Sequence, residues 1–165
     1  MSARSGVFFQ AQGSGPMTLM RLIYASHPFG FDDLVLSHIL KTAQRHNAAV
    51  NISGTLICRE DLYLQLLEGD RSDVEALFEK IKRDDRHADA TILVQETAAQ
   101  RLFPMWAMRH DPARSWMWTR EQVSQGAVEA ATRDEVLAIF VRLVTEQPGH
   151  LSGVPMTCPA SGSKP

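Results

Sequence analysis

A glutamine inside an apolar segment is the residue of this sequence that most needs a chemical explanation. Gln65 stands in the run Tyr-Leu-Gln-Leu-Leu at residues 63–67. A buried amide without partners costs about 1–3 kcal/mol, so this side chain needs hydrogen bonds from the fold or from a ligand. Rotation of the amide exchanges its donor and acceptor ends, which suits a two-state switch. The simpler alternative is an edge strand that points Gln65 to water.

Other side chains could serve such a switch, and each also has an ordinary structural explanation. Tyr24 carries a phenol near the end of an apolar segment, where tyrosines commonly fill the core and leave a hydrated tip. Asn47 follows His46 at the end of a predicted helix, a position that also suits a C-cap. Trp106 and Met108 alternate in a short segment, as residues that pack a strand do. Taken singly, none of these residues decides the function.

The elements that position these side chains follow from the spacing of the apolar residues. Strands are predicted over residues 17–26, 53–59, 62–68, 91–96 and 106–110, of which the second and third form a hairpin. One helix is predicted from the cap Asp32 to about Asn47, and another from a capping box at residues 72–75. This order predicts an α+β, ferredoxin-like β-α-β-β-α-β-β sandwich with two helices on one face of a mixed sheet.

Two C-terminal helices are predicted after the sandwich, from capping boxes at residues 119–122 and 132–135. The second helix carries an apolar stripe, which the open face of the sheet or a second subunit must cover: Val136, Ile139, Phe140 and Leu143. We therefore expect four parts: a mobile N-terminal extension (1–16), a folded domain (17–111), a C-terminal helical extension (112–146) and a disordered tail (147–165).

Composition and charge narrow the classes of function. With 44% hydrophobic and 22% charged residues, the chain is typical of a globular protein. A net charge of −2 argues against nonspecific binding to nucleic acid or to a membrane surface. Cys58 and Cys158 lack C-x-x-C spacing, so neither a disulfide framework nor a metal site is expected. The absence of a signal peptide and of a membrane-length apolar run predicts a cytoplasmic protein.

Taken together and in this order, the residues resemble the BLUF family, the blue-light sensors that hold FAD. The resemblance covers residues 17–110 and rests on five motifs: L-I-Y-A-S at 22–26, H-N at 46–47 followed by I-S-G-T-L at 52–56, L-Q-L-L-E-G at 64–69, I-K-R-D-D-R-H at 81–87, and F-P-M-W-A-M at 103–108. The glutamine motif and the Trp-x-Met motif with an upstream tyrosine are the most specific of these.

The resemblance implies a site for each functional residue. It implies a flavin ring between the two helices of the sandwich, flanked by Ile39 and Ile81 and bound at its polar edge by Asn47. It also implies that Gln65 lies between the flavin and Tyr24, and that Trp106 and Met108 couple the site to the output. Further contacts to the flavin or to its ribityl and phosphate groups are implied for His46, Lys80, Asp84, Arg86 and His87. The implied cofactor is FAD, which FMN can replace in a purified preparation.

The expected function is therefore a photoreceptor and not an enzyme. A light-driven hydrogen-bond change among Tyr24, Gln65 and the flavin would pass to the last strand and the C-terminal helices. No cyclase, phosphodiesterase or DNA-binding motif follows His110, so we expect a short, stand-alone receptor that acts through a homo-oligomer or an unidentified signalling protein. The alternative is a non-photochemical, ferredoxin-like oligomerisation or interaction module.

Two other functions of the same fold class fit the sequence less well. An acylphosphatase-like hydrolase needs a loop of backbone amides with an arginine after the first strand, whereas residues 27–31 read His-Pro-Phe-Gly-Phe. An RNA-binding sheet displays aromatic side chains under a basic surface, which the segment Leu-Gln-Leu-Leu does not supply.

Overall fold

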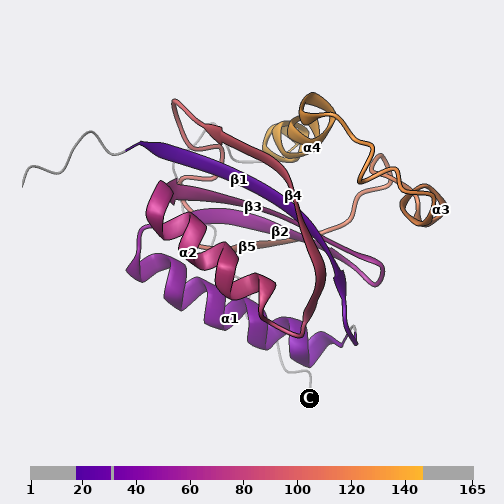
Figure 1. The fold of residues 1–165 in the computed structure, drawn as a ribbon, viewed down its shortest axis with the longest axis horizontal. Coiled ribbons are helices and arrows are strands. Elements are labelled where there is room, and N and C mark those ends of the chain that lie inside the picture. The colour runs from indigo at the N-terminus through magenta and orange to yellow at the C-terminus, as the bar shows by residue number, and fades with distance from the viewer. Residues whose placement is uncertain (1–17, 31, 147–165) are drawn as a thin grey trace, which may run out of the picture.

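A five-stranded mixed sheet organises the protein in its computed structural model, which describes residues 18–30 and 32–146 (Figure 1). The strands are β1 (Leu19–Pro28), β2 (Ser53–Arg59), β3 (Leu62–Asp70), β4 (His87–Thr97) and β5 (Arg109–Pro112). Their order across the sheet is β4-β1-β3-β2-β5. Strand β5 runs parallel to β2, and the other neighbouring strands are antiparallel. The predicted α+β, ferredoxin-like fold class is confirmed. The predicted extension and tail lie outside the described residues.

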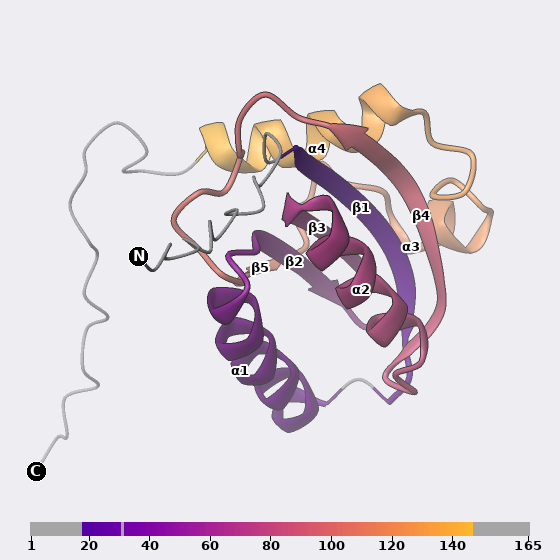
Figure 2. The same ribbon diagram turned by 60° about the vertical axis from the view of Figure 1, so that its left-hand side comes forward.

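Helices cover both faces of this sheet (Figures 1 and 2). They are α1 (Asp33–Ala49), α2 (Arg71–Lys82), α3 (Arg120–Ser124) and α4 (Arg133–Thr145). The first two lie on one face and α4 lies on the other. Because successive side chains of a strand point to opposite faces, β1 sends Met20, Leu22 and Tyr24 toward α1 and α2, and it sends Ile23 and Ala25 toward α4.

The C-terminal helix buries its predicted apolar stripe against the sheet of its own chain. Val136, Phe140 and Leu143 are fully buried, and they share a core with Ile23 and Leu64 of the sheet. Both C-terminal capping boxes are present as predicted, at Thr119 and at Thr132. Of the two covers that the sequence left open, the sheet is therefore the one observed.

Two predicted elements are present but begin at other residues than the sequence indicated. Helix α2 begins at Arg71 with Asp70 as its N-cap, and not with a capping box at Ser72. The Asp70 carboxylate accepts hydrogen bonds from the Ser72 backbone N–H (2.9 Å) and hydroxyl (2.7 Å), so the cap forms as soon as β3 ends. Strand β5 begins at Arg109, and so Trp106 and Met108 precede the strand that was predicted to contain them.

The edge strand β4 is longer than predicted and irregular. It starts at His87 instead of Thr91, and its pairing with β1 shifts register twice, between Ile23 and Tyr24 and between Ala25 and His27. At each shift β4 holds one more residue than β1, which is a β-bulge.

A buried carboxylate on β3 holds the segment that follows β4. Glu68 is fully buried and forms an ion pair with Arg21 at 2.8 Å. It also accepts hydrogen bonds from the backbone N–H groups of Leu102 (2.9 Å) and Phe103 (3.1 Å). Residues 102 and 103 are thereby fixed on the α4 face of the sheet. No helix within the described ranges, 18–30 and 32–146, is long and apolar enough to cross a membrane.

Candidate functional site

A cavity of about 480 Å³ opens between α1 and α2, above β3. Its volume lies within the range of about 300–1,000 Å³ that is common for small-molecule sites. Nine of the ten residues predicted to contact a cofactor line it: Ile39, His46, Asn47, Gln65, Lys80, Ile81, Asp84, Arg86 and His87. The tenth, Tyr24, does not line the cavity but hydrogen-bonds to Gln65, which does.

Sequence reasoning missed five further lining residues: Thr42, Ala43, Arg45, Ala49 and Leu77. Helical spacing carries a signal for them, because residues four apart share a helix face. Ala43 lies midway between Ile39 and Asn47, and Leu77 lies one turn before Ile81.

The strand pairing brings the predicted phenol and amide together. Tyr24 of β1 and Gln65 of β3 are direct partners in the sheet register, and both face α1 and α2. The Tyr24 hydroxyl donates a hydrogen bond to Gln65 Oε1. Gln65 is 5% exposed on an interior strand, so the alternative of an edge residue pointing to water is wrong.

The phenol keeps its proton in this environment. Burial raises the pKa of Tyr24 well above its usual value of 10.0, and the nearby Cys58 thiol raises it further. Burial also raises the pKa of Cys58, to about 12. Tyr24 is therefore a neutral hydrogen-bond donor across the physiological pH range.

Met108, and not Trp106, meets the other end of the amide. Gln65 Nε2 donates to the Met108 sulfur at 3.3 Å, and Met108 is 2% exposed. Trp106 is 39% exposed. Since a thioether is a weak acceptor, the Nε2 end of Gln65 is held less firmly than its Oε1 end.

The loop before β5 is held by side chains of α1 and by the backbone of β2. Three of its carbonyl groups accept hydrogen bonds as follows: Trp106 O from Gly54 N at 3.0 Å, Ala107 O from Asn47 Nδ2 at 2.8 Å, and Met108 O from Gln44 Nε2 at 3.1 Å. Gly54 is required here, because a Cβ atom at this position would lie 2.0 Å from the Leu66 carbonyl oxygen. These long-range contacts replace the strand pairing that was predicted for residues 106–108.

Asn47 connects this loop to the cavity. The helix continues past it to Ala49, with Val50 as the C-cap, so the alternative of Asn47 as a C-cap is wrong. The residue is fully buried, and its Oδ1 atom has no hydrogen-bond partner among the residues that the structure describes. An unpaired buried carbonyl costs about 1–3 kcal/mol, which points to a ligand with a donor group at this wall.

The turn between α2 and β4 supplies charged and titratable groups to the cavity. Asp84 forms a charge pair with Arg86, whose Nε lies 2.8 Å from Asp84 Oδ1, and this contact lowers the pKa of Asp84. His87 lies 3.1 Å from the Ser26 hydroxyl. Burial lowers the pKa of His87 to about 4, so the imidazole is neutral at pH 7.

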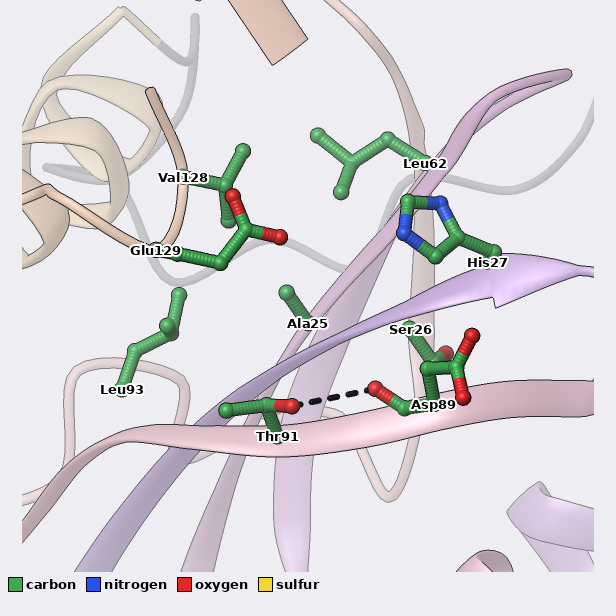
Figure 3. A pocket seen from close by; sticks show the side chains of 9 residues that line it. All are labelled: Ala25, Ser26, His27, Leu62, Asp89, Thr91, Leu93, Val128 and Glu129. Atoms are coloured by element: carbon green, nitrogen blue, oxygen red, sulfur yellow. Dashed lines mark hydrogen bonds between the residues drawn. The ribbon is translucent and has the colours of Figure 1, made fainter. Parts of the chain in front are cut away.

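A second hollow, on the α4 face, is too small for a ligand. Its space of about 10 Å³ is close to the minimum for one water molecule. Figure 3 shows its walls, which include Leu93, Val128 and Glu129, and the Thr91 hydroxyl that donates to the Asp89 carbonyl. Within the described residues, no three His, Cys, Asp or Glu side chains gather as metal ligands would.

Two curated relatives match this chain over 92 residues, about the length of one domain. The β subunit of a photoactivated adenylate cyclase from Euglena gracilis is 37% identical over 92 residues, which are 55% of this chain and 11% of the subunit. The corresponding subunit from Euglena longa is 36% identical over the same length. The chain thus spans about a tenth of the length of these relatives.

Solved structures share the fold over most of the chain. The photo-activated state of BlsA matches with a TM-score of 0.64 and 26% identity, covering 79% of this chain and 96% of that protein. The dark state of BlrB, described as a BLUF protein, matches with a TM-score of 0.66 and 23% identity, covering 79% of this chain and 98% of that protein.

The family model of sensors of blue light using FAD matches residues 19–109, which is more than half of the chain and contains every predicted site residue. The cofactor of this family is FAD, as the sequence motifs implied. The chain belongs to the BLUF family of blue-light sensors.

Proposed function

We propose that this protein senses blue light through Tyr24 and Gln65, with FAD held in the cavity between α1 and α2. The observation that carries the proposal is a buried chain of hydrogen bonds from Tyr24 through Gln65 to Met108, whose central amide lines the cavity. This chain connects a redox-active phenol, an amide that can rotate and return, and the loop before β5.

The residues around the cavity fit a flavin. The pyrimidine edge of a flavin carries an N–H group between two carbonyl groups, which complements the unpaired Oδ1 of Asn47. Ile39 of α1 and Ile81 of α2 supply apolar walls for a flat ring. Lys80 and Arg86 supply positive charge for a pyrophosphate. When bound, the flavin supplies blue absorption and, once excited, a strong oxidant.

Tyr24 and Gln65 supply the reversible change. The Tyr24 proton lies on a hydrogen bond to Gln65 Oε1, so the phenol can release a proton and an electron together and later recover both. Gln65 can return with its amide rotated or as a tautomer. After rotation Nε2 points to Tyr24 and no longer donates to Met108. The changed hydrogen bonding at the cavity wall would shift the cofactor's absorption slightly to the red, without a covalent bond.

The output would leave through the loop before β5. Phe103 is fully buried and its ring centre lies 6.5 Å from that of Trp106 and 6.4 Å from that of Phe140 on α4. A change at Met108 and Trp106 can thus reach α4 through one aromatic side chain. Hydrogen exchange compared between light and dark should differ in residues 103–146, and identical exchange there would instead favour Trp106 and Met108 as fixed core.

The decisive experiment is optical. The purified protein should be yellow, and blue light should shift its flavin bands reversibly to the red. Tyr24→Phe should keep the flavin and lose the shift, because the hydroxyl proton is gone. Tyr63→Phe is the matched control: it removes the other hydroxyl among the chain's two tyrosines, on the same face of the sheet, and should keep the shift. A normal photocycle in Tyr24→Phe contradicts the mechanism.

We further propose that the domain acts as a sensor and not as a catalyst, and that α4 passes its signal to a partner. The cyclase relatives carry a matching segment within much longer chains, which supports a sensory module that serves a separate output. The alternative of a non-photochemical interaction module predicts a colourless protein without a light response.

A further inference from the structure

Trp106 lies outside the site, next to an arginine. The guanidinium carbon of Arg109 lies 5.1 Å from the centre of the Trp106 ring, within the range of a cation–π contact. Met108, two residues after Trp106, takes the buried place beside Gln65. Trp106 thus lies outside the site and Met108 inside it, and the Arg109 guanidinium faces the Trp106 ring.

The Arg109 guanidinium is itself fixed to the sheet. Arg109 is the first residue of β5 and is paired with Thr55 of β2. Its Nη2 donates to Asp111 Oδ1 at 2.6 Å. Asp111 is 2% exposed, and its Oδ2 accepts a hydrogen bond from the Thr55 hydroxyl at 2.9 Å. The cation therefore cannot follow the indole if the loop moves.

One N–H-bearing nitrogen of this guanidinium lacks a conventional hydrogen-bond acceptor in the part of the chain that the structure describes. Arg109 Nη1 is buried and has no hydrogen-bond partner among the described residues. An aromatic face is a weak acceptor for such a group. Loss of the Trp106 ring would take away the aromatic neighbour of a cation that Asp111 continues to hold in place.

We propose that Arg109 keeps Trp106 outside the site by stacking on its ring. Met108, and not Trp106, therefore occupies the buried position beside Gln65. Arg109 is a positioning residue, since it touches neither the cavity nor Gln65. The position of Trp106 can be tested without assuming the proposed function. Only the consequence of that position for signalling rests on the proposed function. A partly desolvated cation–π contact corresponds to about a three- to thirty-fold preference for the outer position of Trp106.

The test follows Trp106 in the full-length, FAD-bound protein in the dark. Labelling with 5-fluorotryptophan gives a fluorine resonance for each of the three tryptophans, assigned with Trp106→Phe, Trp116→Phe and Trp118→Phe. In Arg109→Gln the Trp106 resonance should move toward an inner environment, with at least a three-fold change in the ratio of the two positions. Arg109→Lys, which restores the charge, should recover most of the outer population.

Arg142→Gln is the matched control, because Arg142 stacks on Trp116 with 4.4 Å between the guanidinium carbon and the ring centre. It should shift the Trp116 resonance and leave that of Trp106 unchanged. A Trp106 resonance that is the same in Arg109→Gln and in the unsubstituted protein overturns the proposal. If Arg109→Gln does not fold, Arg109→Met, which keeps an unbranched apolar stem, gives the same measurement.

A second readout separates this proposal from the proposed function. In Arg109→Gln the light-induced red shift should persist, because Tyr24 and Gln65 are untouched, while the rate of dark recovery changes by at least three-fold. An unchanged recovery rate also counts against the proposal. If instead the unsubstituted protein shows no red shift, the proposed function fails, and the resonance of Trp106 still decides what Arg109 does.

Discussion

At the scale of single residues, Gln65 shows how partners and not residue type decide the role of an amide. Its acceptor end takes a strong hydrogen bond from a phenol, and its donor end meets a weakly accepting sulfur. This imbalance leaves one end of the amide ready to exchange its partner. The residues around Gln65 are apolar because β3 is an interior strand with helices on both faces, where water is excluded.

His87 should make the stability of the protein depend on pH. Its pKa is lowered from 6.5 to about 4 in the folded state by burial, so between these values the unfolded chain binds a proton that the folded chain does not. The contribution of neutral His87 to the free energy of unfolding is therefore fully present above pH 6.5. It falls as the pH is lowered toward 4, by up to about 1.4 kcal/mol per pH unit. Urea unfolding from pH 7.5 to 4.5 measures this slope.

His87→Gln keeps a polar partner for Ser26 and removes the titration. Its unfolding free energy should decline less steeply over the same pH window. The difference between the two proteins isolates His87, because the lowered pKa of Asp84 keeps that carboxylate charged throughout. Equal slopes would show that the imidazole is not kept neutral by the fold.

At the scale of elements, local signals predicted three of the four N-caps, and the fourth, Asp70, lies two residues before the expected capping box. The N-caps Asp32, Thr119 and Thr132 are where the sequence indicated, because each accepts a hydrogen bond from a residue two or three positions later. The loop before β5 was mistaken for strand because its hydrogen bonds come from Gln44, Asn47 and Gly54, more than fifty residues away. Alternating large side chains cannot reveal such partners.

Glu68 should anchor the segment that leads to this loop. Glu68→Gln removes the charge that pairs with Arg21 and weakens the acceptor for two backbone N–H groups. Arg21 keeps its ion pair with Glu96, but an amide is a poorer acceptor than a carboxylate for Arg21 and for the two backbone N–H groups, so the variant should lose about 1–3 kcal/mol of unfolding free energy. Amide exchange at Leu102 and Phe103 should become faster, as measured by hydrogen exchange in the dark.

Glu75→Gln is the control for this prediction. It breaks an ion pair with Arg71 whose side chains are about half exposed, and such surface pairs contribute no more than about 0.5 kcal/mol. Equal stability of the two variants would mean that Glu68 does not hold the segment.

At the scale of the whole molecule, the family motifs located nine of the fourteen residues that line the cavity, since each predicted helix needed only the correct face. Two residues outside the cavity wall, Gln44 and Glu68, were also missed as structural anchors, and both act on backbone atoms of distant segments. Gln44 binds the Met108 carbonyl, and Glu68 binds two N–H groups 34 and 35 residues later. Such partners exist only once the sheet has assembled, so neither spacing nor residue type can identify them.

The oligomeric state stays a prediction. The apolar stripe of α4 was one surface that a second subunit could have covered, yet Val136, Phe140 and Leu143 are fully buried within a single chain. If a homo-oligomer forms, sedimentation velocity should show a species whose mass rises with concentration. A monomer at all concentrations would contradict the prediction.

The two bulges of β4 decide how copies of this protein can meet. Adding a strand to an edge requires a regular row of free N–H and C=O groups, and β4 interrupts that row twice, with Asp89 in a left-handed conformation (φ 53°) beside the second bulge. The opposite edge, β5, is only four residues long. Within the described residues, neither edge therefore offers a long regular template for fibril-like stacking, which favours assembly through helices and loops.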